Sequence, residues 1–116
     1  MMIDFEELPE YQKDMKRLLK KYRTLISDLD DVRKDLNDEP GASPPYSFRI
    51  ENLGISTCVI KIKKIASDSF KGKGVQSGFR LIYAYFEAEK RIVFVELYHK
   101  NEKTIEDRER ILKNFK

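Results

Sequence analysis

The strongest constraint on the fold is an eight-residue run that is apolar on both of its faces. Residues 79–86 read Phe-Arg-Leu-Ile-Tyr-Ala-Tyr-Phe. Successive side chains of a strand point to opposite faces, so such a run needs cover on both sides. We therefore expect it to be the central strand of a sheet. Arg80, near its start, carries a charge that needs an anionic partner wherever it is buried.

Neighbouring strands are indicated by alternation and by a short turn. In residues 57–65 apolar side chains alternate with Lys61 and Lys63, which predicts a half-buried strand with a basic outer face. The turn at 87–90 is short, which predicts that the central run and a strand over 91–99 form an antiparallel hairpin. Residues 2–8 are a weaker strand candidate.

Helices are predicted on either side of these strands. Pro9 suits the first position of a helix, and apolar residues from Tyr11 to Ile26 recur at three- and four-residue spacing. Ser27 is expected to cap a second helix, whose acidic first turn complements the helix dipole and which ends at Pro40. Residues 40–47 and 67–78 are interpreted as loops. A capping pair, Thr104 and Asp107, predicts a last helix over about 105–114.

Length and composition favour one domain over residues 1–116, since 41% apolar residues in 116 supply one core. The predicted fold class is α+β, with an N-terminal helical hairpin packed on a small, mainly antiparallel sheet and a short C-terminal helix. A single cysteine excludes a disulfide framework, and the acidic start lacks a signal-peptide pattern. No apolar run approaches membrane-spanning length. We expect a cytoplasmic protein.

Charge is unevenly distributed along the chain. Residues 1–56 hold 9 Lys or Arg and 12 Asp or Glu, whereas residues 57–116 hold 14 and 8. Within 61–80 six basic residues stand against Asp68 alone. A local cluster of this kind raises the potential over one patch and suits a polyanion such as RNA. One cysteine and one histidine make a zinc site of those ligands untenable, and the spacing of a P-loop is absent.

Three segments carry a resemblance to a known family. They are Val59-Ile60-Lys61-Ile62-Lys63-Lys64-Ile65, Ser77-Gly78-Phe79-Arg80-Leu81-Ile82-Tyr83, and Val93-Phe94-Val95-Glu96-Leu97-Tyr98-His99-Lys100. Together with the helix–helix–sheet order, they resemble the RelE/ParE superfamily of toxins. The resemblance spans nearly the whole chain. It implies a type II toxin with a cognate antitoxin as partner.

The RelE-like branch implies a ribosome-dependent, metal-independent endoribonuclease that cleaves mRNA and needs no cofactor. By resemblance, Arg80 contacts the scissile phosphate, and Lys61, Lys63 and Lys100 match lysines of the family. The chain departs from the family where a second arginine and a catalytic tyrosine are expected, since it has Asn101 and Asp107 there. His99 matches a histidine used near the last strand by other ribonuclease branches.

Attack of the ribose 2′-OH on the adjacent phosphate would restrict the reaction to RNA. The expected catalytic residues are Arg80, Lys61, Lys63 and His99. Mutual repulsion of Lys61 and Lys63 is expected to lower a lysine pKa toward the range of a general base, and His99 titrates near neutral pH. The expected RNA-binding residues are Lys64, Lys71, Lys73, Lys100 and Lys103.

Two alternatives remain open. A ParE-like gyrase inhibitor needs no general acid or base, so the Asn101 and Asp107 departures would not weaken it. The second alternative is an inactive relative that keeps only antitoxin binding. No membrane partner and no small-molecule partner is expected.

Overall fold

The computed structural model of the chain describes residues 2–69 and 76–116. The elements in chain order are β1 (Asp4–Glu7), α1 (Pro9–Leu19), α2 (Leu25–Asp38), β2 (Ser47–Arg49), β3 (Cys58–Ile62), β4 (Phe79–Phe86), a 3-10 turn (Glu87–Glu89), β5 (Arg91–His99) and α3 (Arg108–Phe115). The α+β class and the helical hairpin ahead of the sheet are confirmed. No helix in the described ranges is long and apolar enough to cross a membrane.

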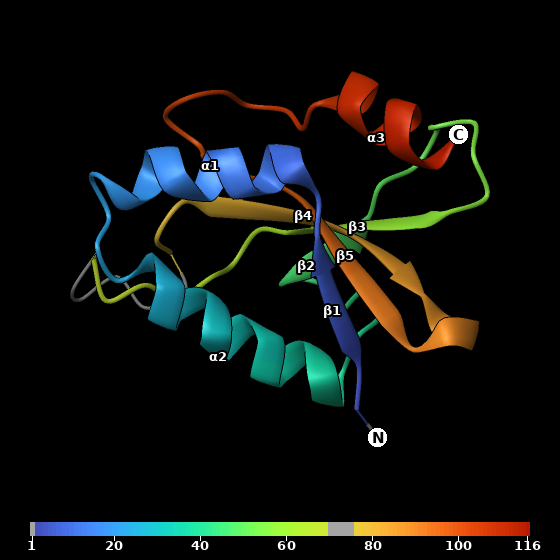
Figure 1. The fold of residues 1–116 in the computed structure, drawn as a ribbon, viewed down its shortest axis with the longest axis horizontal. Coiled ribbons are helices and arrows are strands. Elements are labelled where there is room, and N and C mark those ends of the chain that lie inside the picture. The colour runs from blue at the N-terminus through green and yellow to red at the C-terminus, as the bar shows by residue number, and fades with distance from the viewer. Residues whose placement is uncertain (1, 70–75) are drawn as a thin grey trace.

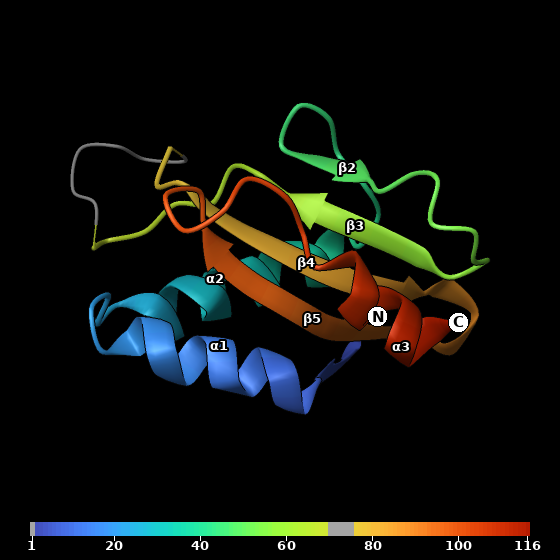
Figure 2. The same ribbon diagram turned by 90° about the horizontal axis from the view of Figure 1, so that it is seen from above.

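Five strands form one sheet in the order β1-β5-β4-β3-β2. β4 is the central strand, as its apolar character on both faces predicted, and it pairs antiparallel with β3 and β5. Figure 2 shows β2, β3, β4 and β5 side by side. β1 pairs with β5 and is the parallel member. In this register Lys61 lies opposite Ile82, and Arg80 lies opposite Tyr98.

Both faces of the sheet carry a core. One core joins the sheet to α1 and α2 through Tyr11, Leu18, Leu29 and Leu36. The other joins the opposite face to α3 through Ile111, which packs with Ile82 and Tyr98 among others. In Figure 1, α3 (red) and α2 (teal) lie on opposite sides of the strands. The α3 face is therefore not the open basic surface that the alternation in β3 predicted.

Three boundaries differ from the sequence prediction. Ser27 is not an N-cap, because α2 begins earlier, at Leu25, and the Ser27 hydroxyl donates to the Thr24 carbonyl at 2.9 Å. The predicted loop over 40–47 runs into the short strand β2, which is too brief to show an alternation. The last helix begins at Arg108, with Asp107 accepting a hydrogen bond from the Arg110 N–H at 3.0 Å.

Candidate functional site

Four cationic side chains meet at one end of the sheet in a cleft of about 290 Å³. We call it the basic cleft. It is lined by Pro45, Lys63, Lys64, Gln76, Gly78, Arg80 and Lys100. β4 brings Arg80, the end of β3 brings the two lysines, and the end of β5 brings Lys100. Of the residues expected to be catalytic, Arg80 and Lys63 line the cleft and Lys61 and His99 do not, and no carboxylate belongs to the described lining.

Arg80 is held by main-chain oxygens and not by an acid. Its Nη1 donates to the Lys63 carbonyl at 3.0 Å and to the Phe79 carbonyl at 3.3 Å. Within residues 2–69 and 76–116, no Asp or Glu forms an ion pair with it. The half-buried guanidinium keeps further N–H donors and its full charge, which suits a bidentate contact with phosphate oxygens.

The floor of the basic cleft is built on Gly78. Its φ of +90° lies in the left-handed region, and a Cβ there would meet His99 Nε2 at 2.8 Å. The Gly78 carbonyl accepts from the Lys100 N–H at 2.9 Å, which joins the cleft floor to the end of β5. A residue without a Cβ is therefore required where the chain passes directly over the His99 ring.

His99 faces the helices, on the side of the sheet away from Arg80. It is buried, and its ring stacks on Tyr22 and meets Phe79 edge-on. Nε2 lies 3.0 Å from the Ser77 carbonyl, and Nδ1 accepts from the Asn101 N–H at 3.1 Å. In this arrangement the ring supports the cleft floor from below and does not line the cleft.

Lys61 is covered by the segment that leads into α3. Its Nζ lies 3.1 Å from Glu106 Oε1, and the two side chains are only 13% and 5% exposed. Burial alone lowers the pKa of Lys61, but the adjacent Tyr98 and the Glu106 carboxylate raise it by more, and the net shift is upward. The expectation that repulsion from Lys63 lowers this pKa is therefore wrong for Lys61.

Lys103 is also engaged within the protein. Its ammonium pairs with Glu96, a buried carboxylate in β5 that also accepts from the Asp107 N–H at 2.8 Å. Neither Glu96 nor Glu106 was expected from the sequence to matter. Glu96 had a signal, since an acid within the apolar run of β5 needs a buried partner. Glu106 had none, because its partner Lys61 is 45 residues away.

Two predicted RNA-binding residues, Lys71 and Lys73, lie outside the described residues. In the described ranges no group of three or more His, Cys, Asp or Glu is placed to hold a metal ion. Among the residues predicted to be functional, those that the structure brings together are the cationic side chains of the basic cleft. It can bind a phosphate and stabilise charge that develops on it.

No model of a known protein family matches the sequence, and neither does the sequence of any curated protein. Solved structures do match. A chain from the crystal structure of the archaeal RelE–RelB complex of Pyrococcus horikoshii OT3 aligns with a TM-score of 0.59 at 14% identity, over 89% of this chain and 100% of that one. The chain has a RelE-like fold.

A second match agrees. A double arginine-to-alanine mutant of the E. coli toxin RelE, in the free state, aligns with a TM-score of 0.54 at 13% identity, over 89% of this chain and 88% of that one. The fold resemblance inferred from β3, β4 and β5 is thereby confirmed. In the RelE-like fold of this chain, the basic cleft lies at the ends of those same three strands.

Proposed function

We propose that the protein is the toxin of a toxin–antitoxin system and an endoribonuclease that cleaves mRNA on the translating ribosome. The observation that carries the proposal is the basic cleft, in which Arg80, Lys63, Lys64 and Lys100 meet without a described acid. The RelE-like fold supports it, and so does the match of Arg80 to the arginine of RelE-like toxins. The RelE–RelB match supports an antitoxin protein as its partner.

The proposed reaction begins with attack of the ribose 2′-OH on the adjacent phosphate. Arg80 binds the phosphate and stabilises the added negative charge, because its guanidinium is fixed by two carbonyls. Glu106 keeps Lys61 protonated and pairs with its charge, so Lys61 does not act as the base. Of the two strand lysines, Lys63 is the exposed one in the cleft and is assigned the proton transfer. It takes the 2′-OH proton as the 2′-oxygen bonds to phosphorus and returns that proton to the 5′-oxygen as the P–O5′ bond breaks. The products are a 2′,3′-cyclic phosphate and a 5′-hydroxyl end.

The remaining residues have supporting roles in this proposal. Lys64 and Lys100 bind backbone phosphates on either side of Arg80. His99 positions Gly78 and, through it, the cleft floor. Metal ions and cofactors have no part in the proposed reaction, and the chemistry relies on side chains of the chain itself.

The alternative is a toxin that binds DNA gyrase without catalysis. One observation favours it: Lys61 and Lys103 are paired with buried glutamates, which leaves fewer side chains for acid–base chemistry. A third possibility is an inactive relative that keeps only antitoxin binding. It would neither cleave mRNA nor inhibit DNA gyrase, and the assays below measure both activities.

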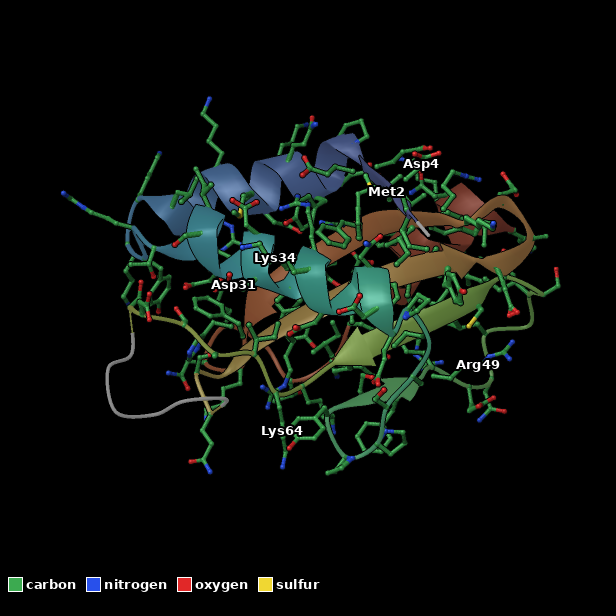
Figure 3. The ribbon with its side chains drawn as sticks, turned by 90° about the horizontal axis from the view of Figure 1, so that it is seen from below. Met2, Asp4, Asp31, Lys34, Arg49 and Lys64 are labelled. Atoms are coloured by element: carbon green, nitrogen blue, oxygen red, sulfur yellow. The ribbon has the colours of Figure 1, made fainter. Side chains whose placement is uncertain are left out.

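The experiment is primer extension on mRNA from a cell-free translation reaction. Wild type is compared with Arg80→Ala and with Arg49→Ala, a matched control because Arg49 is exposed on β2 and does not line the cleft. Figure 3 shows Arg49 well away from Lys64. We expect discrete, ribosome-dependent cuts that fall about 100-fold in Arg80→Ala, in the range for loss of a charge-stabilising donor. They should persist in Arg49→Ala.

Intact mRNA with normal translation in the wild-type reaction would refute the ribonuclease proposal. A supercoiling assay with DNA gyrase then follows, and inhibition there would establish the alternative. Equal cleavage by wild type and a folded Arg80→Ala variant would remove Arg80 from the site.

A further inference from the structure

A second cavity in the described structure lies between α2 and the sheet edge, and of its lining residues it shares Lys64 with the basic cleft. Its volume is about 460 Å³, and we call it the α2 groove. α2 forms one wall. The other is formed by the segment before β2 and the end of β3 with the residues after it. Its lining includes Val32, Leu36, Tyr46, Ile62, Ile65 and Ala66.

Between Leu29 and Leu36, which are both buried in the core, the apolar stripe of α2 has one partly exposed residue. Leu25 and Leu29, in the first half of the helix, are fully buried. Val32, the next residue of the same stripe, is half-exposed and lines the groove. Across from it, Tyr46 is 51% exposed, an unusual position for a large aromatic side chain. Leu36, Ile62 and Ile65 of the lining are themselves buried. The apolar surface open to a partner is therefore that of Val32, Tyr46 and Ala66.

The helical wall of the groove is acidic. Asp31, Asp35 and Asp38 recur at four- and three-residue spacing along α2, so they form one row, and Glu39 follows. Asp31 makes only a long, exposed contact with Lys34, at 3.9 Å. No described cation pairs with Asp35 or Asp38. Asp28, at the inner end, is buried and satisfied by the hydroxyls of Thr24 and Ser67.

Among the described residues, Lys64 is the one cation that lines the groove, and it stands on the other wall. Its Nζ lies over the Tyr46 ring, 5.6 Å from the centroid. Figure 3 labels Asp31 on α2 and Lys64 on the segment that follows β3. The side chains on the acidic wall would repel a nucleic acid. They would attract a cationic chain whose other face is apolar.

We propose that the α2 groove is a docking site for a basic, amphipathic segment of a partner protein. Apolar side chains of the segment pack against Val32, Tyr46 and Ala66, while its lysines or arginines pair with the carboxylates along α2. The proposal does not depend on the ribonuclease activity. Lys64 lines both the α2 groove and the basic cleft, so the bound segment borders the surface assigned to RNA.

The test uses three synthetic peptides of about 14 residues, long enough to span a groove of this kind. The first alternates leucine with lysine, the second replaces lysine by glutamate, and the third replaces leucine by serine. Binding is measured by fluorescence anisotropy. The expected order is that the leucine–lysine peptide binds, the glutamate peptide does not, and the serine–lysine peptide binds at least about fivefold more weakly through loss of apolar burial.

The site is located with matched double variants of equal charge change. Asp35→Asn with Asp38→Asn removes two carboxylates of the groove, whereas Asp4→Asn with Glu109→Gln removes two exposed acids elsewhere. The groove variant should bind the leucine–lysine peptide about fivefold more weakly, since each exposed ion pair is worth roughly 1.4- to 5-fold in affinity. The control variant should bind within about twofold of wild type.

Tyr46→Ser tests the apolar wall at an exposed position where the fold has little to lose. It too should weaken the leucine–lysine peptide. Equal loss in the groove and control variants, or equal binding of the serine–lysine peptide, would reduce the effect to general surface charge and overturn the proposal. The proposal would also be overturned if titration with the leucine–lysine peptide changed amide chemical shifts elsewhere and not around Val32, Ile65 and Ala66. The proposal would also be overturned if the chain alone formed a dimer that dissociates in the groove variants, because the occupant of the groove would then be a second copy of the chain.

Discussion

At the scale of single residues, three glycines in different settings separate steric fit from backbone strain. Gly41 has no nearby atoms, Gly54 has φ +72° in open space, and Gly78 has φ +90° with the His99 ring against it. We expect Gly41→Ala to change the free energy of unfolding little, and Gly54→Ala to lower it by about 1 kcal/mol from the left-handed backbone.

Gly78→Ala should be the most destabilising of the three, by about 2–4 kcal/mol, because strain and the clash with His99 add. Urea unfolding of the three variants measures the series. If Gly78→Ala matched Gly54→Ala, the His99 ring would have room to move and would not support the cleft floor rigidly.

The ion pair of Lys61 and Glu106 predicts a pH dependence. Burial raises the pKa of Glu106, but a main-chain hydrogen bond and the ammonium of Lys61 lower it by more, and the net pKa is depressed. Its stabilisation is therefore present above the unfolded value of about 4.3 and is lost as the pH falls through the lower folded value.

The variant Glu106→Gln should lose about 1–3 kcal/mol near pH 7, because it leaves the Lys61 charge without its acid. The gap to wild type should be smaller at a second pH below the unfolded value of about 4.3, because the stabilisation is lost as the pH falls through the lower folded pKa of Glu106. Urea unfolding at the two pH values measures it. A gap independent of pH would mean that the loss is one of packing.

At the scale of elements, α3 is held against the sheet by the ion pair of Arg110 with Asp14 as well as by the burial of Ile111. Arg110 Nη1 donates to Asp14 at 2.7 Å and to the Val95 carbonyl at 2.8 Å, and Asp14 also accepts from the Leu97 N–H. Arg110→Met removes the guanidinium and leaves Asp14 with its main-chain donor. Amide hydrogen exchange over 108–115 should then speed up at least about tenfold, as local opening costs less.

Lys113→Met is the matched control for that variant. Lys113 is on the same helix, but its side chain is 75% exposed, and its Nζ comes no closer than 3.5 Å to the Glu10 carboxylate. Exchange in α3 should stay close to wild type, because exposed pairs contribute little. Equal acceleration in the two variants would show that Arg110 has no special role in holding α3.

The elements also show where sequence prediction succeeds. β4 was predicted as the central strand because both of its faces are apolar, and that pattern depends only on the burial of the strand itself. Lys61 was predicted to be exposed by the same alternation, and this was wrong. The side chain points where period two places it, but Glu106, far along the chain, covers it. A pattern gives the direction of a side chain, whereas its cover depends on the tertiary fold.

At the scale of the whole molecule, the sequence suggested one broad basic face, and the structure divides its lysines. Lys63, Lys64 and Lys100 line the basic cleft with Arg80, while Lys61 and Lys103 are paired with buried acids. The cleft residues could be proposed from the ends of paired strands. Glu96 could be suspected to need a partner, as an acid within the apolar run of β5, but the pairing of Lys61 with Glu106, 45 residues away, could not be predicted.

This division predicts the salt dependence of RNA binding. Affinity for a single-stranded RNA should fall with salt in proportion to the phosphates neutralised, by about 0.7 in the logarithmic slope for each contact. Lys100→Ala should reduce the slope by about that amount. Lys103→Gln, which keeps a hydrogen-bond donor for Glu96, should leave it unchanged, because that ammonium is already neutralised within the protein. Fluorescence anisotropy across a salt series measures both, with Lys34→Ala on α2 as the exposed control. Equal reductions in Lys100→Ala and Lys103→Gln would mean that RNA draws Lys103 away from Glu96, so that the binding surface extends from the basic cleft onto the α3 face.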